Sequence, residues 1–276
     1  MTLQSIAEAS GVSGCKTIKG SVVIGRAASG LIDLSGPSEI AGDLTLEDNR
    51  NVNSFTANDL TKIGGRFVIR NVTGMSELNI PKLRSTKAIE WTTFSFVNKL
   101  GIESPGITEA DEVIIADTEL KSLDGINITS VKKMDINNNR FLTSFETSLR
   151  DLSDFLNINA NGLSLSVKMP NLVWIANMTI SNVTQFAAPS LAVVNGSARF
   201  DSNYFESFSA PNLTKTVFGD ISFVGNSNLK NITVPKLTNI AGGLLIANNT
   251  ELTDLKGFAK LEEVGGAIKL RGSFDE

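Results

Sequence analysis

A short phrase recurs along nearly the whole 276-residue chain: a glycine, two apolar residues separated by one other residue, and a polar stretch rich in asparagine. Clear copies begin at Gly42, Gly65, Gly219, Gly243 and Gly266. A phrase this short cannot close a core alone, so neighbouring copies must stack and share one. The sequence predicts an all-β, right-handed parallel β-solenoid of about twelve coils. The second apolar position recurs roughly every 22 residues, at Ile24, Leu46, Ile69, Ile89, Ile115, Ile136, Ile158, Ile180, Phe200, Phe223, Ile246 and Leu270.

Alternation within each phrase predicts a strand with one buried face. The residue between the two apolar positions should point outward, as at Val23, Thr45, Val68, Ala88, Ile114, Asp135, Asn157, Thr179, Arg199, Ser222, Leu245 and Lys269. A second inward row is expected four residues before the first apolar position, at Ile18, Ile40, Ile63, Leu152, Trp174, Val194, Val217, Ile240 and Val264. The glycine that follows this row lets the chain bend into the next strand.

The remaining sides of the coil also have recurrent residues. Asparagines follow most strands, as at Asn49, Asn203, Asn226 and Asn249, and an asparagine inside a bend can satisfy open backbone groups. We therefore expect a partial asparagine ladder. A Pro-x-Leu phrase, as at 81–83, predicts short bridges and turns on another side, because proline cannot serve in a fully paired strand.

We predict one domain over residues 1–276, with an N-terminal cap at 1–19. Repeat spacing is loosest around 92–110, which makes this segment the expected junction if the solenoid has two sub-lobes.

Composition excludes several classes of function. The formal net charge is -4 and Lys and Arg are scattered, so nucleic acid is not an expected partner. The chain has no histidine, and we expect no catalytic residues, no metal site and no cofactor. Cys15 is the one cysteine. It is either a buried small residue or half of a disulfide whose partner lies outside this chain.

Residues 229–249, LKNITVPKLTNIAGGLLIANN, resemble the receptor L-domain repeat, which is related to leucine-rich repeats. In particular they resemble the fungal GPI-anchored cell-wall organisation glycoproteins, a family that includes sporulation-specific spore-wall members. Residues 14–24, GCKTIKGSVVI, are similar to that family's first coil, including its cysteine. The resemblance implies secretion, glycosylation, a lipid anchor and a wall role without catalysis. Because a leader and an anchor signal are not recognised here, we expect a trimmed ectodomain whose membrane contact would come only through an anchor absent from this fragment.

Asn-x-Ser/Thr sequons mark candidate glycosylation sites in a secreted protein. They lie at Asn71, Asn127, Asn177, Asn182, Asn195, Asn212, Asn231 and Asn248. Asn71, Asn182 and Asn248 fall at corners of the coil, where the side chain is expected to turn inward and escape modification.

The first part of the outward row is apolar and suggests a binding face, because contiguous exposed apolar surface marks contact sites. The candidate residues are Val23, Val68, Ile114, Trp91, Phe94 and Phe96. The alternative is that the segment around Trp91 folds back and forms a satellite core.

Acidic residues beside the strands raise a carbohydrate-active enzyme as an alternative, with Glu112 and Asp135 to test. Asp43 and Glu47 are instead expected to pair with Arg66 and Arg70 across coils. The favoured function is a non-catalytic secreted glycoprotein that supports cell-wall or spore-wall organisation, at the outer face of the plasma membrane or in the wall. Its partners would be wall polysaccharide or wall-assembly proteins. A receptor-type protein-binding module is the other alternative.

Overall fold

The computed structural model describes residues 1–274 and consists mostly of short parallel strands. Its helices are α1 (Ile6–Ser10) and the 3-10 turn η1 (Lys256–Phe258). Neither of these described helices has the length and apolar character that a membrane crossing needs. The chain divides into two compact units, Met1–Val131 with Asp135–Leu142, and Lys132–Met134 with Thr143–Glu276. The division lies around 131–143 and not in the segment 92–110. The single domain stays a prediction.

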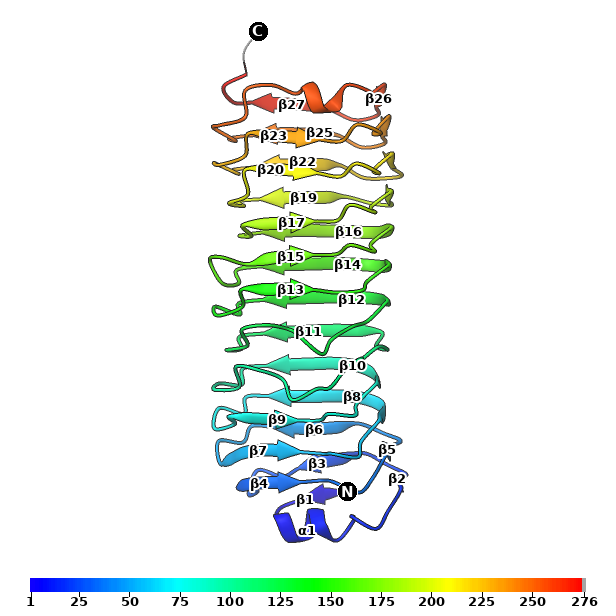
Figure 1. The fold of residues 1–276 in the computed structure, drawn as a ribbon, viewed down its shortest axis with the longest axis vertical. Coiled ribbons are helices and arrows are strands. Elements are labelled where there is room, and N and C mark those ends of the chain that lie inside the picture. The colour runs from blue at the N-terminus through cyan, green and yellow to red at the C-terminus, as the bar shows by residue number, and fades with distance from the viewer. Residues whose placement is uncertain (275–276) are drawn as a thin grey trace. The chain divides into compact units, whose positions relative to one another are not determined.

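In the first unit, each main strand pairs in parallel with the main strand of the coil before or after it (Figure 1). Shorter strands β2 (Thr17–Ile18) and β5 (Glu39–Ile40) join the same sheet, in which β5 pairs with β8. A separate sheet contains β4 (Gly30–Asp33), β7 (Val52–Thr56) and β9 (Glu77–Asn79). The main strands are β1 (Thr2–Leu3), β3 (Val22–Ile24), β6 (Leu44–Glu47), β8 (Lys62–Arg70), β10 (Ser85–Thr92) and β11 (Glu112–Ala116).

The second unit repeats this arrangement, and β12 (Ser130–Asn137) contributes residues to both units. The main strands are β14 (Asp151–Asn159), β16 (Trp174–Ser181), β19 (Ala198–Asp201), β22 (Ile221–Val224), β25 (Leu244–Ala247) and β27 (Ile268–Arg271). The short strands beside them are β18 (Val193–Val194), β21 (Lys215–Thr216), β24 (Asn239–Ile240) and β26 (Glu263–Val264). The Pro-x-Leu side holds β13 (Ser144–Glu146), β15 (Ser166–Lys168), β17 (Gln185–Ala187), β20 (Ser207–Ser209) and β23 (Asn231–Thr233).

Both units are therefore parallel β-solenoids, and residues 1–274 make about 12 coils, as predicted. The strands that carry the Pro-x-Leu phrase have only three residues each, which confirms the expected short bridges. The inward rows of Leu, Ile, Val and Phe form the core that successive coils share.

The register differs from the prediction in one coil of the first unit. Ile89 lies beside Phe67, and Trp91 lies beside Ile69, so Trp91 and not Ile89 fills the second inward position. An irregularity in β10 between Thr86 and Ala88 shifts the pairing. The alternation alone could not reveal this shift, because residues 89 and 91 are both apolar.

The outward row changes in the same coil. Glu90, and not Ala88, stands between Val68 and Ile114. Ala88 is 5% exposed. A carboxylate therefore interrupts the apolar row that the sequence predicted.

The second inward row differs at two positions in the second unit. Ile175 and Thr216 occupy it, whereas the prediction placed Trp174 and Val217 there. Thr216 is 1% exposed, and its hydroxyl donates to the Gly219 carbonyl at 2.7 Å. A hydrogen-bonded polar side chain is thus tolerated in the core.

Most main strands are followed by a left-handed residue, and the side chain after that residue points into the core. Left-handed examples are Asp48, Asn182 and Asn248, with φ of 52°, 61° and 57°. Asparagine is common at the next position, and the partial ladder is confirmed at Asn49, Asn139, Asn161, Asn203, Asn226 and Asn249, all of which are buried. Asn203 Nδ2 donates to Asn226 Oδ1, and Asn226 Nδ2 donates to Asn249 Oδ1, each at 3.0 Å.

Glycines before several main strands allow close approach between coils, as at Gly42, Gly65, Gly219 and Gly266. Gly42 does not have a positive φ, but a Cβ there would lie 2.7 Å from the Ser21 backbone nitrogen. The structure thus replaces the predicted reason, a sharp bend, with a steric one.

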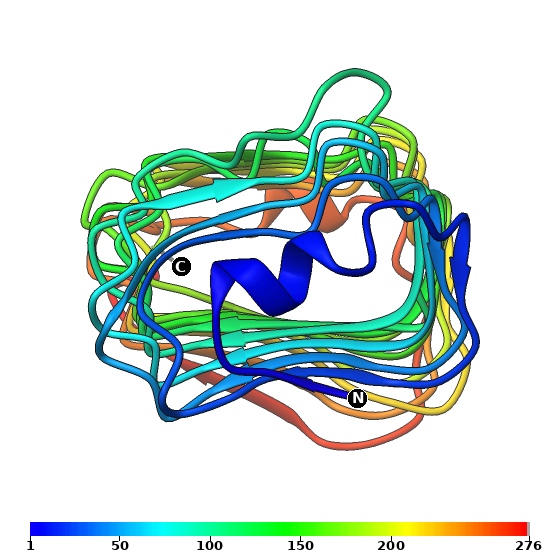
Figure 2. The same cartoon turned by 90° about the horizontal axis from the view of Figure 1, so that it is seen from below.

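The N-terminal coil and the C-terminal strand β27 differ in how their inward residues are covered. Figure 2 shows α1 lying across the N-terminal coil, where the helix contacts β1 and β4 and buries Ala9. The segment 1–19, expected as a cap, contains α1 and also β1 and β2, of which β1 pairs with β3. At β27, Ile268 and Leu270 are 57% and 44% exposed. Within residues 1–274, β27 pairs only with β25, so the predicted inward Leu270 is not buried.

Candidate functional site

The predicted aromatic binding face is wrong for two of its three aromatic residues. Trp91 and Phe94 are both 0% exposed, and the Trp91 ring packs edge-on against Phe67 at 5.5 Å between centroids. Phe94 follows the left-handed Thr93 and so takes the inward corner position that asparagine fills elsewhere. Trp91 and Phe94 are therefore core residues, but they belong to the shared core of the coils and not to the satellite core that was the alternative. Phe96 alone stays on the surface, at 61% exposure.

The aliphatic part of that face is also not a continuous apolar patch. Val23 is 38% exposed, Ile114 is half-buried and Val68 is only 8% exposed. Glu90 interrupts this outward row, and Arg66 and Arg70 lie on the same strand and face as Val68.

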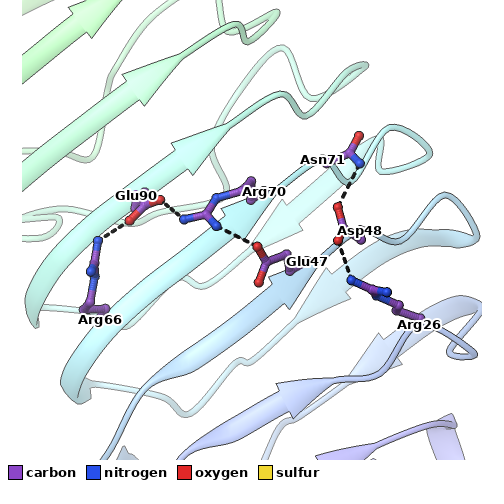
Figure 3. A network of polar contacts seen from close by, with 7 residues as sticks. All are labelled: Arg26, Glu47, Asp48, Arg66, Arg70, Asn71 and Glu90. Carbon is purple, nitrogen blue, oxygen red and sulfur yellow. Dashed lines mark hydrogen bonds and ion pairs between the residues drawn. The ribbon is translucent and has the colours of Figure 1, made fainter.

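A network of ion pairs covers this region (Figure 3). Glu90 binds both Arg66 and Arg70, and Arg70 also binds Glu47 through Nη1 and Oε1 at 2.6 Å. The Glu90 side chain is 13% exposed, and its hydrogen bond to Arg70 is the main reason that the pKa of Arg70 is raised. The predicted Glu47–Arg70 pair is confirmed. Asp43 instead accepts the Arg66 backbone N–H at 2.8 Å, so the predicted Asp43–Arg66 ion pair is wrong.

The carboxylate of Asp48, also drawn in Figure 3, likewise has its hydrogen-bonding and charge partners within the fold. Asp48 accepts a hydrogen bond from Asn71 Nδ2 at 2.9 Å and pairs with Arg26 at 2.6 Å. The Asn71 hydrogen bond is the largest cause that lowers the pKa of Asp48, followed by Arg26. The charges of Figure 3 satisfy one another, and they offer little to a ligand.

An open groove of about 570 Å³ lies on the outward face of the main sheet in the second unit. Arg199 and Lys269 line it from the first and last of four consecutive main strands, and Ser222 and Leu245 occupy the same row on the two strands between them. Its full lining is Arg199, Asp201, Asp220, Ser222, Val224, Gly242, Gly243, Leu244, Leu245, Gly266, Ala267 and Lys269.

Asp201 is the polar residue in this groove whose bonding is incomplete. Its Oδ1 atom is buried and has no hydrogen-bond partner among the described residues. Burial raises the pKa of Asp201, and the nearby Arg199 opposes that rise. Asp220, in contrast, accepts the Gly243 N–H at 2.7 Å. The groove is therefore lined by a half-buried carboxylate that has no ion-pair partner within residues 1–274, and the part of it that faces the groove can accept a hydrogen bond from a ligand.

The described residues contain no cluster of three His, Cys, Asp or Glu side chains that could hold a metal ion. Of the two acids named for a hydrolase, Glu112 is half-buried in β11 and Asp135 accepts a hydrogen bond from Asn137 Nδ2 at 2.8 Å. Neither lines the groove of the second unit.

The asparagine side chains of the eight sequons differ in exposure to solvent and in hydrogen bonding. Asn231 and Asn248 are exposed, and Asn127 and Asn195 are half-buried. Asn248 does not turn inward as expected, because the left-handed turn directs the next residue, Asn249, into the core. Side-chain amide nitrogens donate hydrogen bonds at Asn71, Asn177, Asn182 and Asn212.

Cys15 is exposed, so the interpretation as a buried small residue is wrong. Its pairing with a cysteine outside this chain stays a prediction.

The stacked parallel coils and their shared core define the class of the protein: it is a β-solenoid repeat protein. Comparison with known proteins then identifies the family to which the chain belongs. The chain is 37% identical over 277 residues to protein ecm33 of Aspergillus fumigatus, covering 100% of this chain and 69% of the relative. It is 33% identical to a cell surface GPI-anchored protein of Arthroderma benhamiae, covering 99% of this chain and 70% of the relative.

Similarity extends to sporulation-specific protein 2 of Saccharomyces cerevisiae, with 36% identity over 95% of this chain. The chain spans only 52% of that relative and 57% of sporulation-specific protein 22. No protein-family model matches the chain, and no solved structure matches it. The chain belongs to the fungal family of ecm33-type and sporulation-specific cell-surface proteins.

The groove in the second unit was not predicted as a site. Of its residues, Arg199, Ser222, Leu245 and Lys269 were predicted only as outward residues of the main strands. The available signal was the succession of small residues in adjacent coils, at Gly242–Gly243 and Gly265–Gly266, which leaves room between longer side chains.

Proposed function

We propose that this protein is a non-catalytic cell-surface repeat protein that supports organisation of the fungal cell wall or spore wall. The observation that carries the proposal is membership of a family whose relatives are named for the cell wall, the cell surface and sporulation. The names of these relatives are structural and not enzymatic.

The fold supports a scaffolding mechanism. In the second unit, successive coils are hydrogen-bonded to one another through parallel pairing, and buried asparagines reinforce the corners. Such coils hold an outward sheet face in fixed register. In this proposal, the protein presents that face to wall polysaccharide or to a wall-assembly protein, outside the plasma membrane or within the wall.

The proposal is tested by complementation in a fungus that lacks its own ecm33-type protein. The chain is expressed between the host protein's leader and anchor segments, and growth is measured with dyes that bind wall polymers. Restored resistance is expected. A chain that reaches the wall in normal amount, shown by immunodetection, and restores no resistance contradicts the proposal.

An enzyme assay separates the carbohydrate-active alternative. Purified protein is incubated with β-glucans, chitin and pectins, and released sugar is measured. We expect no release above a heat-denatured control. Release that disappears in Asp201→Asn or Asp220→Asn would establish an enzyme instead, since these two carboxylates line the same groove. Glu112→Gln and Asp135→Asn test the pair that the sequence suggested.

A pull-down separates the receptor-type alternative. Wall proteins and wall glycans are offered together to the immobilised chain. Capture of a single protein that added glycans do not displace would favour a protein-binding module over a polymer scaffold.

Glycosylation is proposed first at Asn231 and Asn248, because both side chains are exposed. Expression through a fungal secretory pathway, followed by glycosidase treatment and peptide mass spectrometry, should show glycan at these two sequons. Unmodified peptides at both sites would contradict this proposal. The same experiment reports on the other six sequons.

A further inference from the structure

We propose that the groove across β19, β22, β25 and β27 binds a neutral polysaccharide chain, with Asp201 accepting hydrogen bonds from sugar hydroxyls. This inference rests on the proposed function and names the surface and the ligand class.

The groove results from side-chain size in successive coils. Arg199, Ser222, Leu245 and Lys269 occupy one outward row in consecutive main strands, each beside the next. Ser222 is short and is only 7% exposed, and the backbone of Gly242 and Gly243 lines the same space. A chain molecule can therefore lie across several coils between Arg199 and Lys269.

The carboxylate of Asp201, which lines the groove, lacks a hydrogen-bond donor for one of its oxygens within the described part of the chain. It lies two residues after Arg199 on β19 and on the same face of the strand. Its buried Oδ1 has no partner, and a buried acceptor without a donor is costly. Ligand hydroxyl groups donate hydrogen bonds to carboxylates, and the half-buried Asp201 lines the groove, so a bound sugar can donate to the part of this carboxylate that faces the groove.

Charge in the groove favours a neutral ligand. Two cations, Arg199 and Lys269, and two carboxylates, Asp201 and Asp220, line it, so their formal charges cancel. A polyanion would meet both carboxylates and a polycation both cations, whereas a sugar can donate to one sign and accept from the other. Leu245 and Val224 add apolar surface on which the C–H face of a sugar ring can rest.

The first unit provides the contrast on the equivalent face. There Glu90 binds Arg66 and Arg70, and Glu47 binds Arg70. Those carboxylates already have cationic partners within the fold. The groove of the second unit has no ion pair within 4.0 Å for Arg199, Asp201 or Lys269 among the described residues.

The test is titration calorimetry of the 276-residue chain with defined oligosaccharides of β-1,3-glucose, β-1,4-N-acetylglucosamine and α-mannose. At least one neutral series should bind, with affinity rising with chain length. Asp201→Ala should weaken binding about tenfold to a hundredfold, because a hydrogen bond to a charged group is lost. Lys269→Ala, at an exposed position, should weaken it less.

Two further variants keep the test sharp. Ser222→Phe fills the groove and should abolish binding, and circular dichroism checks that the variant folds. Asp59→Asn, which changes an exposed carboxylate in the first unit, is the matched control and should bind like the wild type. Equal affinity of Asp201→Ala, Lys269→Ala and the wild type would place the site elsewhere and overturn the inference.

Other outcomes also decide the matter. Preference for an anionic polysaccharide, or no binding of any neutral series at millimolar concentration, overturns the inference. The complementation experiment distinguishes this failure from failure of the proposed function. If the chain restores wall resistance and Asp201→Ala restores it equally, the scaffold function stands while the groove is not its binding site.

Discussion

The asparagine ladder predicts a large loss of stability when Asn226 is replaced by alanine. Asn226 is 0% exposed. Its Oδ1 accepts from the Asn203 N–H at 2.9 Å and from Asn203 Nδ2 at 3.0 Å. Its Nδ2 donates to the Phe200 carbonyl at 2.9 Å and to Asn249 Oδ1 at 3.0 Å. Alanine removes all four hydrogen bonds.

The cost of Asn226→Ala depends on which groups lose their only partner. Asn203 Nδ2 keeps the Ile180 carbonyl, and Asn249 Oδ1 keeps the Asn226 backbone N–H. The Asn203 N–H, however, keeps no acceptor, and a buried unsatisfied donor costs about 1–3 kcal/mol. Adding the lost contribution of the other hydrogen bonds gives about 2–5 kcal/mol.

The measurement is chemical denaturation in guanidinium chloride, with hydrogen exchange to locate the loss. Repeat proteins can unfold in parts, so amide exchange should show the largest change in coils that contain residues 203, 226 and 249. Asn231→Ala is the matched control, because Asn231 is exposed in the same unit, and a change within about 0.5 kcal/mol is expected. If both variants lose the same stability, the buried hydrogen bonds do not hold the corners together.

Three other predictions follow from the packing and charges. Ile246→Ala should cost about 2–5 kcal/mol, because Ile246 is 0% exposed, whereas Leu270→Ala in the same row should cost far less at 44% exposure; equal losses in denaturation would contradict the row assignment. Glu90→Gln should lower the melting temperature at low salt and less so in 1 M salt, since it weakens two ion pairs; a salt-independent effect would contradict this. Asp201→Asn should raise stability at neutral pH. Burial raises the folded-state pKa of Asp201, so the wild type loses stability as pH rises from the unfolded-state pKa through the folded-state pKa. The advantage of the variant should disappear in acid, and a constant advantage across pH would refute it.

Much of the fold could be predicted because its signals are local and repeated. Alternation within strands identified the inward residues in most coils, including Leu46, Ile158 and Ile246. The corner asparagines were recognised because each serves its own bend. Prediction failed where two local patterns fitted equally well, as at Ile89 and Trp91, where the pairing of β8 with β10 decides the register.

Cross-coil contacts limited prediction of the candidate site. The Glu47–Arg70 pair was predictable from repeat spacing, but the position of Glu90 depended on the register shift in β10. Trp91 and Phe94 could be classed as surface or core only once the neighbouring strands were in place. The groove could not be found from any single coil. The space above the short side chain of Ser222 exists only because longer side chains, Arg199 and Lys269, line it from other coils.

By itself, the amino-acid sequence determined that this protein stacks short parallel coils, because alternation and repeat length act within a few neighbouring residues. Apart from the Glu47–Arg70 pair, tertiary structure decided which charges pair and which stay unsatisfied. That choice depends on side chains about 22 residues apart that come within hydrogen-bonding reach only after stacking. Glu90 thereby gains two arginines, while Asp201 keeps a buried oxygen without a donor.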